Sequence, residues 1–153
     1  MAEILIVVGS ESGNARLVAD GVREALLRAG HRVELAPDRD CAGLRLDRRD
    51  VLLVCTSTHG LGDWPENIAP FARSLDERRP DLSGLRYGVI ALGDRTYGET
   101  FCLAGRRLDE ALRRLGARRL GERLEIDACR QPLPDEDALA WLRGWVRLLD
   151  AGP

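Results

Sequence analysis

A short loop near the start of the chain carries residues that could hold a phosphate group. Ser10 and Ser12 offer hydroxyl groups, and Gly13 allows the backbone to approach a ligand closely. The loop follows the apolar run 4–8 and precedes a helical pattern that starts at Arg16. A helix N-terminus presents free N–H groups and partial positive charge, which favour an anion. The loop alone leaves a second interpretation open, in which Ser12 only caps the helix.

Two further loops carry flat side chains that could hold a planar ligand. The loop 56–65 contains His59 and Trp64, and the loop 93–100 contains Tyr97. Together with the first loop, they indicate a ligand with one phosphate and one planar ring system, such as flavin mononucleotide (FMN). The pattern GxGxxG, typical of dinucleotide sites, is missing from the first loop.

These loops follow three apolar runs that we expect to be buried strands, at 4–8, 51–55 and 87–92. Strands alternating with helical patterns indicate an α/β fold, a doubly wound three-layer sandwich around a five-stranded parallel sheet. The three loops then share the carboxyl edge of the sheet, where ligands bind in such folds. The other expected elements are strands at 32–36 and 118–127 and helices from Arg16 to before Gly30, over 66–77 with Pro70 in its first turns, over 101–115, and over 138–149 with Asp135 as its cap.

Length and charge narrow the classes of protein. With 153 residues we expect a single domain, 1–153, and the net charge of −2 implies no nucleic-acid partner. No apolar run reaches membrane-spanning length, and the N-terminal segment shows no export signal. We therefore expect a cytoplasmic protein without a membrane partner.

The chemistry of the basic residues and cysteines excludes several kinds of site. All 23 basic residues are arginine, which excludes a P-loop lysine, a Schiff-base lysine and the lysine of signalling receiver domains. The four cysteines are scattered without a CxxC pair, so we expect free thiols and no structural zinc. We expect Cys55 and Cys102 to act as small buried hydrophobic side chains, and Trp141 and Trp145 to anchor the core.

Three segments resemble the ligand-binding loops of the flavodoxin family. Residues 10–15 resemble its phosphate loop, residues 57–67 its first flavin loop (especially as found in diflavin reductases), and residues 91–102 its second flavin loop. The likeness covers essentially the whole chain, and the absence of a long insertion within 118–127 is typical of the short-chain subclass. The resemblance implies a flavodoxin-like sheet with strand order 2-1-3-4-5 and FMN as the cofactor.

The resemblance also implies roles for individual residues. Tyr97 would stack on the outer face of the flavin, whereas either His59 or Trp64 would cover the inner face. It implies neither catalytic nor metal-binding residues. The cofactor-binding residues would be Ser10, Glu11, Ser12, Gly13, Asn14, Ala15, Thr56, Ser57, Thr58, His59, Gly60, Leu61, Gly62, Leu92, Gly93, Asp94, Tyr97, Phe101 and Cys102.

The function implied is that of a monomeric electron carrier, not an enzyme. It would move single electrons from an NADPH-dependent flavodoxin/ferredoxin reductase to an acceptor protein, docking transiently to each. Two alternatives stay open: a flavodoxin-like NAD(P)H:quinone reductase, and a flavodoxin-like module that has lost the flavin.

Gly60 gives a prediction about the one-electron (semiquinone) form of the flavin. In the family, the peptide after the inner-face residue can flip so that its carbonyl accepts the flavin N5–H. Glycine makes this flip cheap because it lacks Cβ. We expect Gly60→Ala to lower the yield of one-electron reduced flavin in a redox titration. An unchanged yield would argue against the flip.

Overall fold

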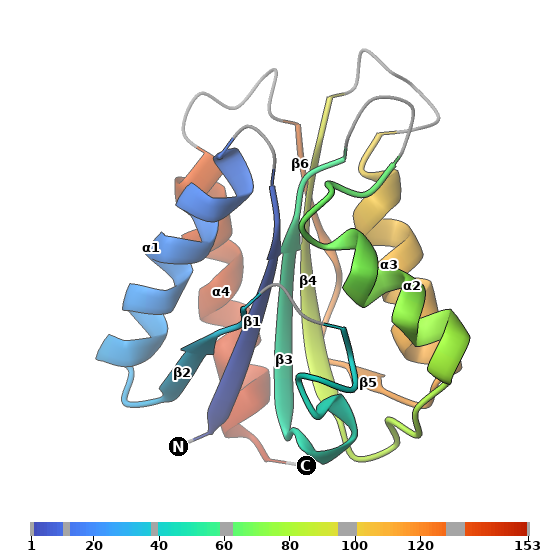
Figure 1. Ribbon diagram of the computed structural model, residues 1–153. Coiled ribbons are helices and arrows are strands. Elements are labelled where there is room, and N and C mark those ends of the chain that lie inside the picture. The colour runs from blue at the N-terminus through green and yellow to red at the C-terminus, as the bar shows by residue number, and fades with distance from the viewer. Residues whose placement is uncertain are drawn as a thin grey trace.

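The computed structural model of the protein describes residues 2–10, 13–37, 40–58, 63–94, 101–127 and 134–152, with backbone only at 134 and 135. Strands and helices alternate along the chain as expected (Figure 1). The elements are β1 (Glu3–Gly9), α1 (Asn14–Arg28), β2 (Arg32–Leu35), η1 (Leu46–Arg48), β3 (Val51–Thr56), α2 (Ala69–Arg78), β4 (Arg86–Gly93), α3 (Leu103–Arg114), β5 (Arg118–Arg119), β6 (Leu124–Asp127) and α4 (Pro134–Asp150).

The strands form one sheet in the order β2-β1-β3-β4-β5, and β6 also pairs with β4. Every strand pair is parallel. The predicted order 2-1-3-4-5 is therefore confirmed, and with it the α/β class. Because parallel strands run in one direction, the carboxyl ends of β1, β3 and β4 lie at the same edge, which is the upper edge in Figure 1.

The fifth position of the sheet differs from the prediction of one strand over 118–127, so the expected count of five strands is wrong. Two short strands, β5 and β6, pair with the lower and upper parts of β4. Between them the chain turns at Gly121, which has a φ of 71°. The turn is held by Arg119 Nε, which donates to Gly121 O (2.9 Å), and by Trp141 Nε1, which donates to Glu122 O (3.0 Å).

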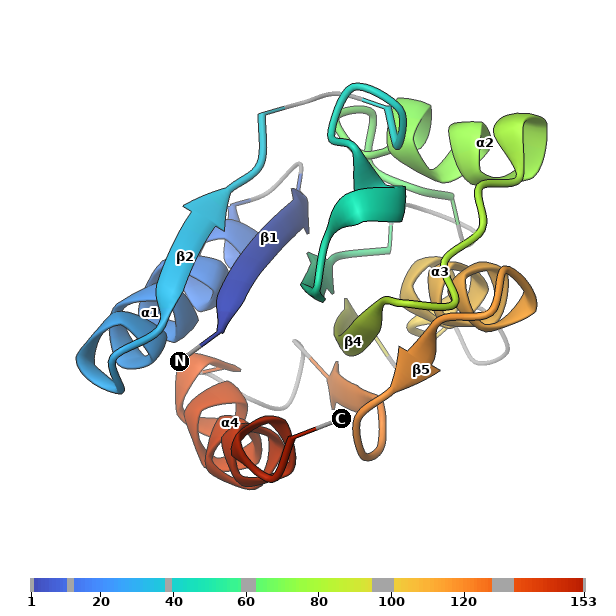
Figure 2. The same ribbon diagram turned by 90° about the horizontal axis from the view of Figure 1, so that it is seen from below.

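Helices cover both faces of the sheet. Figures 1 and 2 show α1 and α4 on one face and α2 and α3 on the other. Along β1, Ile4, Ile6 and Val8 pack with α1 and α4, whereas Leu5 and Val7 pack in the cluster with α2 and α3. Successive side chains of a strand point to opposite faces, so a sheet covered on both faces needs strands that are apolar throughout.

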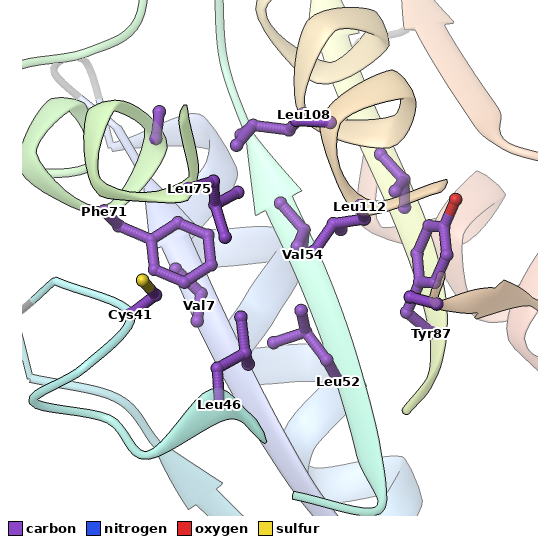
Figure 3. Close-up of a cluster of buried hydrophobic side chains, with 14 of the residues drawn as sticks. Val7, Cys41, Leu46, Leu52, Val54, Phe71, Leu75, Tyr87, Leu108 and Leu112 are labelled. Atoms are coloured by element: carbon purple, nitrogen blue, oxygen red, sulfur yellow. The ribbon is translucent and has the colours of Figure 1, made fainter. Parts of the chain in front are cut away.

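The core beneath α2 and α3 joins the two helices to the sheet. Phe71 and Leu75 from α2, Leu108 and Leu112 from α3, and Val7 and Val54 of the sheet lie in one cluster (Figure 3). On the opposite face, Trp145 of α4 is 2% exposed and stacks with the half-buried Trp141 at a centroid distance of 5.9 Å. Both tryptophans therefore belong to the core side of α4, as predicted.

All four helices begin at a residue other than the predicted one. The helix α1 begins at Asn14, two residues before the expected Arg16. The helix α2 begins at Ala69 instead of Glu66, with Pro70 in its first turn as expected. The helix α3 begins at Leu103, two residues later than predicted. The helix α4 begins at Pro134, so the prediction of Asp135 as its cap is wrong and Asp135 lies within the helix. Proline suits a first helical position, because the N–H that it lacks has no helical partner there. In the part of the chain that is described, no helix is long and apolar enough to cross a membrane.

A buried carboxylate ties the β5–β6 turn to α3. Asp109, 1% exposed, accepts hydrogen bonds from Tyr87 Oη (2.5 Å), Arg119 (2.5 Å) and Arg123 (2.6 Å). Burial, with the Asp109 hydrogen bond as the second cause, raises the pKa of Tyr87, so the phenol stays protonated and donates. Two arginines thus neutralise one buried charge and hold both sides of the turn against the helix.

We expect Asp109→Ala to lower the free energy of unfolding by about 3 kcal/mol, because the substitution leaves two partly buried guanidinium groups and a buried phenol without their acceptor. Urea unfolding followed by circular dichroism measures the change. The neighbouring Glu110 is exposed, and Glu110→Ala should change the same quantity by less than about 0.5 kcal/mol. Equal effects of the two substitutions would contradict this role for Asp109.

Candidate functional site

The candidate site lies where β1, β3 and β4 end side by side. Gly9 of β1 pairs with Thr56 of β3, and Thr56 pairs with Ala91 of β4. The three loops selected from the sequence therefore leave neighbouring strands at one edge, which we call the rim. The rim brings together the described parts of all three loops: residues 10 and 13–15, 56–58 and 63–67, and 92–94 with 101–102.

The first loop ends at a helix N-terminus that has no side-chain cap. The N-cap of α1 is Gly13, with a φ of 92°, and the first turn contains no acidic residue. Ser10 Oγ accepts a hydrogen bond from Gly13 N (2.9 Å). The first N–H groups of a helix have no helical partner, so those at the start of α1 are available to an anion. Glu11 and Ser12, which we also predicted to bind, lie outside the described residues.

The fit to a phosphate can be tested on Gly13 itself. A Cβ atom built at Gly13 would have no atom within 4 Å, so the loop is open above this residue. Asn14 is exposed beside it, whereas Ala15 turns its side chain into the core. The described part of the loop therefore suits a phosphate held by backbone N–H groups and the Ser10 hydroxyl. Ala15 can take part through its N–H alone.

The start of the second loop is hydrogen-bonded to β1 and to α3. Ser57 N donates to Gly9 O (2.8 Å), which continues the pairing of β3 with β1. Thr56 is fully buried, and its hydroxyl donates to Ser57 O (3.0 Å). Thr58 Oγ1 accepts from Ala104 N (3.3 Å) at the start of α3. The hydroxyl groups of Thr56 and Thr58 are therefore both hydrogen-bonded. Among the described contacts, the hydroxyl of the half-buried Ser57 has no hydrogen bond.

Trp64 connects the second loop to α3. Its indole Nε1 donates to Ala104 O (3.1 Å), and its ring packs against the core cluster under α2 and α3. These contacts show that Trp64 holds the second loop against α3. His59, Gly60, Leu61 and Gly62 lie outside the described residues, so the choice between His59 and Trp64 for the inner face stays a prediction.

The third loop begins at a close approach of two backbones. A Cβ atom at Gly93 would lie 2.5 Å from Cys102 N, so glycine lets β4 end directly against the start of α3. Leu92, Phe101 and Cys102 are buried beneath the rim, and Asp94 is half-buried at its surface. Tyr97 lies outside the described residues. The structure therefore places the side chains of these three buried residues in the support of the rim.

The thiols of Cys55 and Cys102, which lie under the rim, are unreactive. Cys102 Sγ donates to Ala91 O (3.4 Å), and Cys55 Sγ donates to Ala15 O (3.3 Å). Burial raises the pKa of each thiol to about 12, with the charge of Glu125 as a further cause at Cys102. Both thiols are protonated near neutral pH and therefore unreactive, in keeping with the prediction that they pack as small hydrophobic side chains.

An ion-pair group lies next to the third loop. Arg106 of α3 makes a bidentate pair with Glu125 of β6 (2.7 and 3.0 Å) and lies 5.9 Å from the ring centroid of Phe101. Hydrogen bonds from Arg106, and then from Arg123, lower the pKa of Glu125, which therefore stays ionised. The pair fixes the start of α3 against the strand that continues toward the rim.

Two rim residues were missed by the sequence analysis. Asn67 bonds the end of β1 with both ends of its carboxamide, through Ser10 N (3.0 Å) and Val8 O (2.8 Å). Its one sequence signal is a polar amide at the end of the second loop, directly before an apolar helix face. Asp127, buried at the end of β6, pairs with Gly93 across the strands. Its signal is its place as the last residue of a predicted strand. Among the described residues no three His, Cys, Asp or Glu side chains could hold a metal ion together.

The narrow space at Gly9 gives a prediction for the rim. A Cβ atom there would collide with Thr56 Oγ1 and lie 2.7 Å from Ile68 Cγ2. We expect Gly9→Ala to lower the free energy of unfolding by about 1–3 kcal/mol, because the first and second loops must move apart. Gly84→Ala is the control: a Cβ atom there meets nothing within 4 Å. Unfolding midpoints that are the same for both variants would contradict the close packing at Gly9.

Comparison with known proteins agrees with this arrangement. The family model described as Flavodoxin matches residues 6–141. Protein MioC of Escherichia coli K12 is 40% identical over 97% of this chain and 99% of its own length. A solved mutant of the flavodoxin from Pseudomonas aeruginosa is 33% identical, with a TM-score of 0.89, and the alignment covers 97% of this chain and 99% of that one. A flavodoxin mutant of Fusobacterium nucleatum, bound to flavin mononucleotide, is 19% identical and shares the fold (TM-score 0.80, covering 96% of each chain). The chain belongs to the flavodoxin family.

Proposed function

We propose that this chain binds FMN at the rim and carries single electrons between a reductase and an acceptor protein. The proposal rests on the place where the first two loops meet. An uncapped helix N-terminus, suited to a phosphate, lies beside strand ends from which two further loops leave. The family and the flavodoxin of Fusobacterium nucleatum, whose structure holds flavin mononucleotide, support FMN as the ligand.

The residues of the first loop would hold the phosphate. Asn14 and Ala15 would contribute backbone N–H groups, and Ser10 its hydroxyl, which accepts a hydrogen bond from Gly13 N. The absence of an acidic side chain from the first turn of α1 removes a charge that would repel the phosphate. Bound FMN would supply the one-electron chemistry. The polypeptide would hold the ring and limit its contact with water.

The residues of the second and third loops would surround the ring. Ser57 and Asp94 reach the surface of the rim, and Thr56, Thr58, Leu92 and Cys102 would support the backbone next to it. With both described rim thiols protonated, Cys55 and Cys102 have no part in electron transfer. The chain would act as one domain, taking its electrons from an NADPH-dependent reductase and passing them to a separate acceptor protein.

The proposal is tested with the purified protein and FMN. We expect a yellow complex after FMN is added and the excess removed. NADPH should reduce the complex rapidly only when a flavodoxin/ferredoxin reductase is present, and an added acceptor such as cytochrome c should reoxidise it. Absorbance of the flavin in a stopped-flow instrument measures both steps.

Two results would contradict the proposal. A protein that stays colourless with FMN would be a module without flavin. Steady oxidation of NADPH with a quinone, by the protein alone, would make it a quinone reductase.

A further inference from the structure

Within the described parts of the chain, the end of β1 lacks a strand neighbour on one side. The last residue of β2, Leu35, pairs with Ile6, and Ala36 N still donates to Ile6 O (2.8 Å). Backbone polar groups of alternate strand residues point to the same side. The carbonyl of Val8 and the N–H of Ser10 therefore point toward the side of β2, beyond the place where β2 has ended. Gly9 points the other way and pairs with β3, because Gly9 O accepts from Ser57 N.

The carboxamide of Asn67 takes the place of the missing strand. Its Nδ2 donates to Val8 O (2.8 Å), and its Oδ1 accepts from Ser10 N (3.0 Å). A residue of a parallel strand makes the same two bonds, one to the carbonyl before its partner and one from the N–H after it. Two otherwise unpaired backbone groups at the rim are satisfied in this way by one side chain.

These bonds lead directly to the phosphate-binding loop. Asn67 fixes the backbone of Ser10, and Ser10 Oγ accepts from Gly13 N (2.9 Å). The carbonyl of Gly13 in turn accepts the helical bond of Leu17 N (2.9 Å). The Asn67 side chain thus fixes the beginning of the first loop, and α1 begins at the end of that loop.

The same side chain closes the second loop onto β1. The loop starts at Ser57, which bonds Gly9, and ends at Asn67, which bonds Val8 and Ser10. Both ends of residues 57–67 are therefore attached to three consecutive residues at the end of β1: Val8, Gly9 and Ser10. The position of the phosphate loop depends on a side chain delivered by the loop that leaves β3.

We propose that Asn67 is a positioning residue for the phosphate loop and sets the preference of the site for FMN over riboflavin. The inference rests on the proposed function, because it assigns a role toward the phosphate of the same ligand. Without the Asn67 carboxamide, Ser10 would lose its fixed place. The hydroxyl and N–H groups that face the phosphate would then be less well ordered. The ring would keep its contacts in the second and third loops.

The test compares Asn67→Ala with the wild type and with Ser74→Ala. Ser74 of α2 is a matched control: its Oγ accepts from Cys41 N (2.9 Å) and donates to Phe71 O (2.7 Å), so it also joins a loop to the core through two backbone bonds, but it has no bond to the first loop among the described contacts. Dissociation constants for FMN and for riboflavin are measured by quenching of flavin fluorescence. Thermal unfolding of each apoprotein is measured in parallel.

We expect Asn67→Ala to weaken FMN binding about tenfold or more. Riboflavin binding should change by less than about threefold, so the preference for FMN falls. Ser74→Ala should lower the stability of the apoprotein and leave the preference unchanged. A wild-type preference in Asn67→Ala would overturn the inference, as would an equal loss for both ligands, which a merely structural role predicts.

A second variant keeps the test decisive if Asn67→Ala does not fold. Asn67→Asp keeps the size of the side chain, and as a carboxylate it cannot donate to Val8 O. Its preference for FMN, relative to the wild type in the same buffer, should be reduced at about pH 8 and should begin to recover only near about pH 4, where protonation of the carboxylate restores a donor. A wild-type preference at both pH values would overturn the inference. Failure of the wild type to bind FMN would instead overturn the proposed function, and the inference with it.

Discussion

Hydrogen bonds to the last residues of β1 hold the rim together. Ser57 N reaches Gly9 from the side of β3, and the Asn67 carboxamide reaches Val8 and Ser10 from the other side. A buried strand end with unpaired backbone groups is costly, so some partner has to be supplied where β2 stops short. In this chain the partner comes from the second loop, and the solution to a local hydrogen-bonding problem links two loops of the site.

The strands β5 and β6 are held by charge pairs instead. Asp109 binds Arg119 and Arg123 around the β5–β6 turn, and Glu125 binds Arg106 and Arg123. Arginine suits this network because its planar guanidinium can bond two acceptors in fixed directions. The network holds a strand position that is built of two short pieces, and it places β6 so that its end reaches the rim at Asp127.

Patterns of neighbouring residues were sufficient to predict the helices and the strands β1 to β4, whereas the strand order 2-1-3-4-5 came from the resemblance to the flavodoxin family. The apolar runs at 4–8, 51–55 and 87–92 coincide with β1, β3 and β4, because strands covered on both faces must be apolar throughout. The break at 120–123 was missed because it depends on Gly121 in a left-handed conformation and on arginine bonds to a distant carboxylate. A local pattern of alternating residues shows neither the conformation of Gly121 nor these arginine bonds.

The candidate site shows the same division. The first loop and the start of α1 could be located from a change of period, and Gly13 proved to be the N-cap. Asn67 could not be found in this way, because its partners Val8 and Ser10 lie 59 and 57 residues away in sequence. Nor could the sequence separate side chains on the rim from those beneath it, such as Thr56 and Cys102, since burial depends on how the helices pack.

In the proposed function the rim receives FMN, and no other part of the described chain does. Amide hydrogen exchange measured by NMR, with and without FMN, tests it residue by residue. We expect slower exchange on FMN binding for the amides of 13–16, 57–58 and 93–94, and no change at the opposite edge of the sheet around His31, Asp50 and Arg86. Protection at that opposite edge, or none at the start of α1, would contradict the proposal.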